Sequence, residues 1–166
     1  MKTELAQSFR RLEYRPPVYT FDQVELDIAL DPARTIVKSN IEVLPGKSFE
    51  PGTPLVLLGQ ELEFVSLRIN GKAHRHFELT PETLTIHSLP QEGREKFTVE
   101  IICICVPEKN TSLMGLYVSN GNFFTQCEAE GFRKITYFLD RPDVMARYRV
   151  TLQAPEARYP VFLSNG

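Results

Sequence analysis

Polar and apolar residues alternate along much of this chain, and this alternation is its clearest structural signal. From Val24 to Leu30 every second residue is apolar, and the segment Ile36–Leu44 follows a turn sequence at Asp31–Arg34. Side chains at positions i and i+2 of a strand point to one face of a sheet. The two segments are therefore predicted to be half-buried strands joined by a turn.

Further strands are predicted at 55–58, 64–69, 84–89, 96–106, 115–118, 123–125, 148–152 and 159–163. The dipeptides Asn70-Gly71 and Asn120-Gly121 mark turns, because both residues of such a pair can take positive φ angles. The segment at 96–106 is the most apolar, and its second face becomes apolar from Ile102 onward. This pattern is typical of a strand covered on both sides.

The pattern contains no long amphipathic helix. A short helix near 129–137 is the only one expected inside the strand-rich region, and the sequence at 140–143, with its Pro142, would end it. Short strands separated by Gly, Pro and Asn turns predict an all-β fold, an antiparallel β-sandwich or a curved-sheet domain. Residues 1–13 are expected to form a flexible arm, which leaves 14–166 as one domain.

Composition and charge narrow the functional classes. The chain has 166 residues, of which 42% are hydrophobic and 24% charged, an ordinary balance for a globular domain. Its 19 basic and 21 acidic residues are interspersed, so neither nucleic acid nor an anionic membrane is an expected partner. The segment MKTELAQSF lacks the apolar core of a signal peptide, and the three cysteines include no Cys-x-x-Cys pair. A cytoplasmic location is therefore predicted, with Cys103 and Cys105 as small core residues.

A possible metal site lies on the arm that follows the first Asn-Gly turn. If this arm is a strand, His74, His76 and Glu78 share one face of it. A solvated strand face is the favoured interpretation of this regular spacing, and a metal site is the alternative.

The stretch 125–144, TQCEAEGFRKITYFLDRPDV, departs from the strand pattern. If Gln126 and Glu128 lie at the end of a strand, their side chains sit side by side on one face. A carboxylate in that position can accept hydrogen bonds from an ammonium group, whereas the simpler interpretation is two solvated residues before a turn. Glu130 and Arg133, three residues apart, are predicted to form an ion pair that fixes the local turn.

The same stretch carries a family resemblance. QCEAEGFR followed by ITYFLDRPDV closely resembles the N-terminal domain of the bacterial aminopeptidase N family, which are zinc metallopeptidases. The resemblance extends from the Tyr-Arg-Pro-Pro sequence at 14–17 to Phe-Leu-Ser-Asn-Gly at 162–166. It implies that Glu128 binds the α-amine of a peptide substrate and that Gln126 lines the first side-chain pocket. It also implies a following thermolysin-like domain that holds the metal, the general base and a second amine-binding glutamate.

The resemblance leads to two further expectations. The family chain continues beyond this point, so the domain at 14–166 is expected to be truncated before its last strands and able to self-associate through the edge left open. A zinc peptidase needs the motif H-E-x-x-H, which does not occur in these 166 residues, so this fragment is predicted to bind no metal and to be inactive alone.

The sequence therefore predicts the substrate-anchoring domain of a cytoplasmic zinc aminopeptidase. No catalytic residue is assigned to it, and Zn(II) belongs to the full-length enzyme. The expected partners are the N-terminus of a peptide and the chain's own downstream catalytic domain. The alternative is an autonomous β-sandwich module that binds a protein or a carbohydrate, in which 125–144 serves only the structure.

Overall fold

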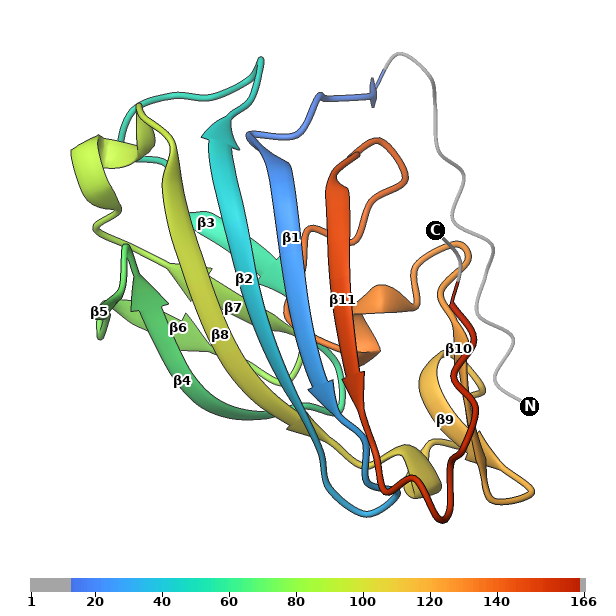
Figure 1. Ribbon diagram of the computed structural model, residues 1–166. Helices are drawn as coiled ribbons and strands as arrows, with labels where there is room; N and C mark the ends of the chain where they lie inside the picture. Colours follow the sequence, from blue (N-terminus) through green and yellow to red (C-terminus); the bar gives the residue numbers. More distant parts are fainter. Residues whose placement is uncertain (1–12, 165–166) are drawn as a thin grey trace.

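The computed structural model describes residues 13–164 as an arrangement of β-sheets (Figure 1). The largest sheet has six strands in the order β11-β1-β2-β8-β4-β5. Its strands are β1 (Tyr19–Ala29), β2 (Thr35–Pro45), β4 (Glu63–Ile69), β5 (Lys72–Ala73), β8 (Phe97–Cys105) and β11 (Arg147–Gln153). Neighbouring strands are antiparallel except for β1 and β11, which run parallel.

Two smaller sheets complete the domain. One has the order β3-β7-β6, and the other is the hairpin of β9 and β10. Their strands are β3 (Leu55–Leu58), β6 (Phe77–Leu79), β7 (Thr83–Ile86), β9 (Gly115–Ser119) and β10 (Asn122–Gln126). Helical structure within residues 13–164 consists of short 3₁₀ turns, among them η2 (Pro90–Gly93), η3 (Pro107–Lys109) and η4 (Phe132–Lys134). The all-β prediction is confirmed, and the short helix expected near 129–137 is the single turn η4.

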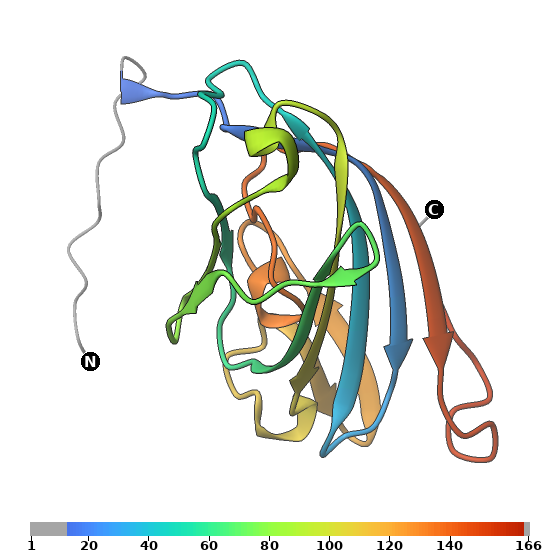
Figure 2. The ribbon, with the colours of Figure 1, turned by 90° about the vertical axis from the view of Figure 1, so that its left-hand side faces the viewer.

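The core lies between the large sheet and the three-stranded sheet, which packs against one face of it (Figure 2). In β8 the residues Phe97, Val99 and Ile101 alternate with more exposed ones and are almost fully buried. In β3 the side chains of Leu55 and Leu57 are fully buried. Burying one such side chain contributes roughly 1.5–3 kcal/mol. The alternation seen in the sequence is thus the pattern of contact between the two layers.

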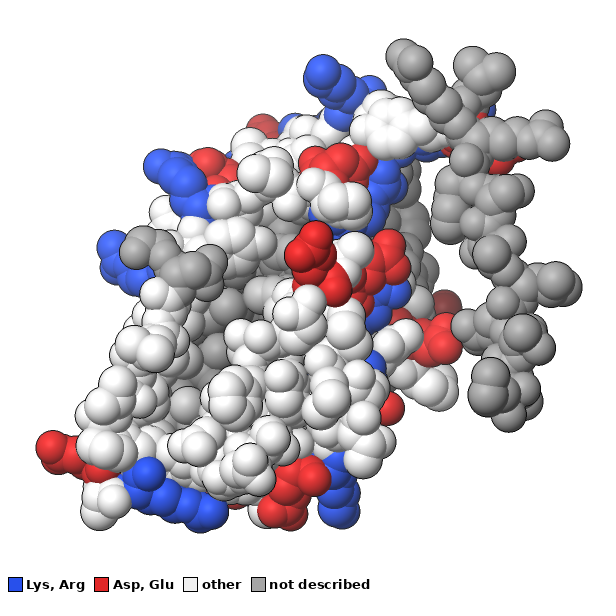
Figure 3. Space-filling view, turned by 90° about the vertical axis from the view of Figure 1, so that its right-hand side faces the viewer, with Lys and Arg blue, Asp and Glu red and all other residues white. Residues whose placement is uncertain are grey.

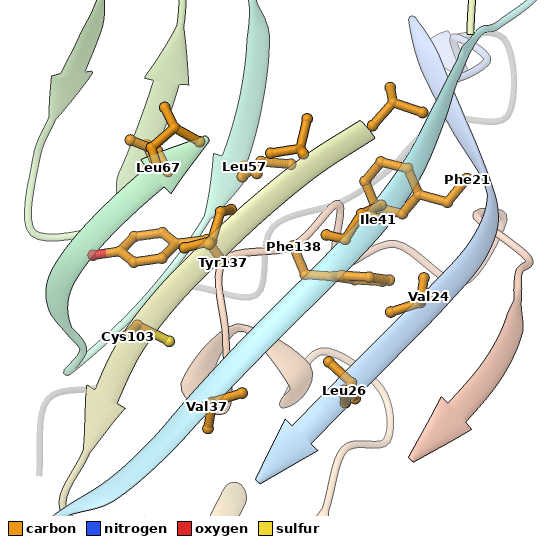
Figure 4. Close-up of a cluster of buried hydrophobic side chains, with 14 of the residues drawn as sticks. Phe21, Val24, Leu26, Val37, Ile41, Leu57, Leu67, Cys103, Tyr137 and Phe138 are labelled. Carbon is orange, nitrogen blue, oxygen red and sulfur yellow. The ribbon is translucent and has the colours of Figure 1, made fainter. Parts of the chain in front are cut away.

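Part of the stretch 125–144 belongs to this core. Tyr137 and Phe138 are buried among side chains from both layers, as Figure 4 shows for Leu57 and Cys103. A Cβ atom on Gly59 would lie 2.4 Å from the ring of Tyr137, so only glycine allows this approach. The middle of the stretch is therefore held between the sheets, and its two ends reach the surface.

Several details of the sequence-based prediction are confirmed. Asn70 and Gly71, the pair between β4 and β5, have φ angles of +48° and +74°. Asn120 and Gly121, between β9 and β10, have φ angles of +49° and +77°. The thiol of Cys103 is buried as expected, and so is that of Cys105.

The prediction of a strand at 159–163 is wrong. This segment is irregular, with the side chains of Val161 and Leu163 largely exposed. Pro160 has no N–H to donate to a sheet, and Tyr159 packs instead on the ring of Phe123, with the centroids 5.0 Å apart. The apolar residues of this segment therefore do not reflect burial in a sheet.

Other expectations concern the ends of the chain and of the sheet. The arm predicted at 1–13 lies outside the described residues except for Glu13. The truncation and the self-association remain predictions, although β11 does form one edge of the large sheet. None of the helical segments in residues 13–164 has the length and apolar character needed to cross a membrane.

Candidate functional site

Gln126 and Glu128 lie where the hairpin of β9 and β10 ends. Gln126 is the last residue of β10 and pairs with Gly115 of β9, whereas Glu128 follows after the strand has ended. The two side chains therefore do not share a strand face, and that expectation is wrong. Instead, the Gln126 side-chain amide Nε2 donates a hydrogen bond of 3.2 Å to the main-chain carbonyl oxygen of Glu128. The peptide bond between Glu128 and Ala129 is cis.

A close approach of two main-chain segments explains why the strand ends here. The N–H of Gly131 donates to the carbonyl of Cys127, with an N···O distance of 2.9 Å. A Cβ atom on Gly131 would lie 2.5 Å from the carbonyl oxygen of Gln126 and 3.0 Å from the nitrogen of Gly115. Real Cβ atoms do not approach other atoms so closely, so the turn packs on the hairpin only because residue 131 is glycine.

Arg133 organises the charges behind this turn. Its Nη2 lies 3.0 Å from Oε2 of Glu130, which confirms the predicted ion pair. The structure adds a second partner, because Nε of Arg133 lies 2.8 Å from Oδ2 of Asp140, whose side chain is only 8% exposed. The sequence analysis missed Asp140, which lies seven residues away and outside the reach of a helical turn.

The last acidic residue of the stretch is also paired. Asp143 accepts two hydrogen bonds from Arg141, of 2.9 and 2.7 Å, and one of 2.9 Å from the hydroxyl of Tyr14. The guanidinium of Arg141, helped by the hydroxyl of Tyr14, lowers the pKa of the Asp143 carboxyl below its usual range. The same hydrogen bond raises the pKa of the Tyr14 hydroxyl.

Glu128 is the exception among the acidic residues of the stretch 125–144. Glu130, Asp140 and Asp143 each pair with an arginine of the same stretch. Lys134 is engaged as well, with its Nζ 2.9 Å from Oε2 of Glu61. Within residues 13–164 the exposed carboxylate of Glu128 has neither an ion-pair nor a hydrogen-bond partner. It is therefore available to a cation that comes from outside the domain.

One face of the molecule has large uncharged areas. Figure 3 shows the side of the molecule that carries β9, β10 and the C-terminal segment, where broad uncharged areas separate small groups of charged side chains. Phe124 of β10 is exposed on its strand, as are Val161 and Phe162 of the C-terminal segment. Phe124, two residues before Gln126 on β10, therefore adds exposed apolar surface close to the end of this strand.

The histidines do not form the metal site considered as an alternative. His74 and His76 lie between β5 and β6, in irregular structure, so they do not share a strand face with Glu78. The ring Nε2 of His74 lies 2.8 Å from the carbonyl oxygen of His87 and is occupied by it. No cluster of three or more His, Cys, Asp or Glu side chains in residues 13–164 is arranged to hold a metal ion. The donor set of this part of the chain does not fit zinc.

The structure is an all-β domain, and its candidate site consists of one amide and one unpaired carboxylate at the surface. Comparison with known families assigns it further, since residues 16–166 match the Peptidase M1 N-terminal domain. The chain belongs to this family.

Individual relatives agree with the assignment. The chain is 41% identical over 162 residues to aminopeptidase N of Haemophilus influenzae and 40% identical over 164 residues to aminopeptidase N of Escherichia coli K12. These matches cover 98% and 99% of this chain but only 18% of each relative. The chain thus spans about a fifth of the length of the curated relatives, and the resemblance to the aminopeptidase N family is confirmed.

Solved structures show the same relationship. The crystal structure of Legionella pneumophila aminopeptidase A in complex with aspartic acid superposes with a TM-score of 0.84 and 34% identity, over 93% of this chain and 18% of that one. An M1 zinc metallopeptidase mutant from Deinococcus radiodurans, bound to a Tyr-Ser-Ala substrate, superposes with a TM-score of 0.68 and 18% identity, over 81% of this chain and 32% of that one. The second similarity concerns the fold alone.

Proposed function

We propose that this chain is the substrate-anchoring domain of a zinc-dependent aminopeptidase that removes N-terminal residues from peptides. In this proposal the carboxylate of Glu128 binds the substrate's α-ammonium group. The metal and the catalytic groups belong to a downstream domain outside these residues. A cytoplasmic location also remains a prediction from the sequence.

The observation that carries the proposal is the unpaired carboxylate of Glu128. The other three acidic residues between 125 and 144 are neutralised by arginines, so Glu128 alone offers an uncompensated negative charge there. A peptide α-amine, with a pKa of about 7.7–8.0, is largely cationic at neutral pH. Hydrogen bonds between an ammonium and a carboxylate are charge-assisted and stronger than neutral ones. An ammonium group is therefore the ligand that best fits this position.

This binding mode explains how an exopeptidase selects the first peptide bond. A carboxylate at the end of the binding cleft favours a charged amino terminus and disfavours a chain that continues past it. Gln126, next to the carboxylate, is proposed to line the pocket for the first side chain. Its Nε2 is directed to the carbonyl of Glu128, while its Oε1 has no hydrogen bond within residues 13–164.

Zinc would be held by the downstream domain, because the described residues of this chain offer no suitable ligand set. There the metal would activate a water molecule and polarise the scissile carbonyl. The contribution of this chain is to bind and orient the amino terminus. Membership of the peptidase family and the unpaired Glu128 favour this role over an autonomous binding module.

The test is steady-state kinetics of the complete enzyme on an aminoacyl arylamide and its N-acetylated form. In the complete enzyme the downstream domain would enclose the bound amine, and removing one partner of an ion pair buried in this way costs about 2–5 kcal/mol. Glu128→Ala is therefore expected to lower kcat/KM for the free amine by roughly 30-fold to several thousand-fold. Glu128→Gln keeps the shape without the charge and should also be impaired. Zinc content should not change, and a Glu128→Ala enzyme with wild-type discrimination against the blocked amine would contradict the proposal.

A further inference from the structure

A single guanidinium group connects three parts of the stretch that carries Glu128. Arg133 Nη2 lies 3.0 Å from Oε2 of Glu130, two residues after Glu128. The same Nη2 donates to the carbonyl oxygen of Asp140 at 3.1 Å, and Nε donates to the Asp140 carboxylate at 2.8 Å. The main-chain N–H of Arg133 also donates to that carboxylate, at 3.1 Å. The turn after Glu128 and the chain at Asp140 are thereby locked together.

The hydrogen bonds between Arg133 and Asp140 are shielded from water. The side chains of Arg133 and Asp140 are only 15% and 8% exposed, so water competes little for these hydrogen bonds. The planar guanidinium makes several of these bonds at once, which the single ammonium of a lysine cannot reproduce. The geometry of the pair therefore depends on the shape of arginine as well as on its charge.

The turn at 127–133 is also attached to two other parts of the domain. The carbonyl of Arg133 accepts a hydrogen bond of 2.8 Å from the N–H of Gln60, just after β3. On the other side Gly131 packs against the carbonyl of Gln126 at the end of β10. Glu128 lies between Gln126 and Gly131, so a shift of the turn at Gly131 and Arg133 would carry its main chain along.

Arg133 also controls which carboxylate remains unpaired. Glu130 is 57% exposed and lies two residues from Glu128, so it would compete for an approaching cation if Arg133 did not neutralise it. With Arg133 in place, Glu128 is the one acidic side chain of 125–144 without an ion-pair partner in the described part of the chain.

From these contacts we infer that Arg133, through its ion pair with Glu130 and its hydrogen bonds to Asp140, is a positioning residue that sets the location of the Glu128 carboxylate and makes it the sole anion offered to the substrate amine. This inference rests on the proposed function of Glu128. Arg133 itself touches no substrate and acts through Glu128.

The experiment compares two competitive inhibitors of the complete enzyme, L-leucine hydroxamate and 4-methylpentanohydroxamate, which lacks the α-amine. The inhibition constant of 4-methylpentanohydroxamate divided by that of L-leucine hydroxamate measures recognition of the amine. This ratio does not depend on the fraction of active enzyme. Because a displacement near 1 Å is enough to weaken a positioned contact strongly, Arg133→Ala should lower the ratio about tenfold or more. Arg133→Lys keeps the charge but loses the planar guanidinium with its several donors. It should lower the ratio by a smaller factor.

Arg141 provides the matched control, since it forms an Arg–Asp pair in the same stretch but, within the described residues, makes no hydrogen bond or ion pair with the turn at 127–133. Arg141→Ala should leave the ratio at its wild-type value. In an enzyme that already carries Glu128→Ala, Arg133→Ala should cause no further loss, because both changes remove the same interaction.

The outcomes separate the two proposals. A wild-type ratio in Glu128→Ala would remove the proposed function and the inference with it. A low ratio in Glu128→Ala together with a wild-type ratio in folded Arg133→Lys would overturn the inference alone. Additive losses in the double variant would also overturn it, since Arg133 would then act independently of Glu128. If Arg133→Ala fails to fold, the Arg133→Lys enzyme decides.

Discussion

Leu58 and Phe138 exchange two main-chain hydrogen bonds, of 2.8 and 2.9 Å, as an isolated antiparallel bridge. Leu58 ends β3, the outer strand of the three-stranded sheet, so the bridge attaches the chain of Phe138 to that edge. The ring of Phe138 then reaches Phe21 of the large sheet, with a centroid distance of 5.0 Å. One residue thus ties the stretch of Glu128 to both layers of the core.

Phe138→Ala is expected to destabilise the domain strongly. The change leaves a cavity between the two layers, and such substitutions cost about 3–5 kcal/mol. Urea unfolding of the chain followed by circular dichroism measures the loss. Phe124→Ala is the control, since Phe124 is 47% exposed and makes one stacked contact with Tyr117, at a centroid distance of 5.7 Å. It should cost about 1 kcal/mol or less, and equal losses in the two variants would mean that the Phe138 ring does not anchor the core.

Most strands could be predicted from the sequence because burial in two layers imposes an alternation that the residues record directly. The segment at 96–106 is an example, with alternate residues of β8 buried as expected. The parallel pairing of β1 with β11 was not predicted, because alternation does not encode which strands become neighbours. The prediction for 159–163 failed for a related reason, since Val161, Phe162 and Leu163 lie on the surface.

The candidate site was predictable only in part. The pair of Glu130 and Arg133 followed from local spacing, and the structure contains it. The place of Glu128 relative to Gln126 did not follow, because it depends on how closely the main chain of Gly131 packs on the hairpin. Contacts of this kind join segments whose separation is decided by the whole fold, and no local pattern signals them.

The close packing at Gly131 leads to a second prediction. Gly131→Ala places a methyl group 2.5 Å from the carbonyl oxygen of Gln126, so the turn must move away from β10. Overpacking of this kind costs about 1–3 kcal/mol. Backbone amide resonances should shift over 115–116 and 126–131. In the control Gly121→Ala no atom lies within 4 Å of the added Cβ, so the only strain comes from the φ angle of +77° and shifts should be confined to the hairpin tip. Unchanged resonances around Gln126 in Gly131→Ala would contradict the close approach.

A third prediction concerns the three thiols and alkaline pH. Burial raises the pKa of Cys103 to about 11, that of Cys105 to about 12 and that of Cys127 to about 11. In the unfolded chain these thiols titrate near pH 8.5, so above that pH the folded state retains protons that the unfolded state releases. The contribution of the three thiols to the free energy of unfolding should therefore be constant up to about pH 8 and fall as the pH rises toward 11.

Urea unfolding at pH 7.5 and pH 10 tests the direction of this effect. Reaction with iodoacetamide at pH 8.5 gives an independent measure, because only the thiolate reacts. Labelling should be slow in the native chain and fast in urea, with Cys127, the least buried of the three, reacting first. Rapid native labelling of Cys103, or stability that rises between pH 8 and 10, would show that these thiols are not shielded as the structure indicates.

The last prediction separates the two residues of the proposed site. Gln126→Ala removes the hydrogen bond from Nε2 to the carbonyl of Glu128 but leaves the carboxylate in place. A neutral hydrogen bond contributes about 0.5–1.5 kcal/mol, so kcat/KM of the complete enzyme should fall by about tenfold or less, well below the effect of Glu128→Ala. Because Gln126 is proposed to face the first side chain, the loss should differ among alanyl, leucyl and arginyl arylamides.

Asn122 supplies the matched control for Gln126, since it lies at the other end of β10 and its amide also donates to a main-chain carbonyl, that of Asn120, at 3.3 Å. Asn122→Ala removes a hydrogen bond of the same kind away from the site, so kcat/KM should stay at the wild-type value for all three substrates. If Gln126→Ala instead lost as much activity as Glu128→Ala, and equally on every substrate, the amide and not the carboxylate would anchor the amino terminus. A uniform but small loss would assign Gln126 to holding the main chain of Glu128, without a role in side-chain preference.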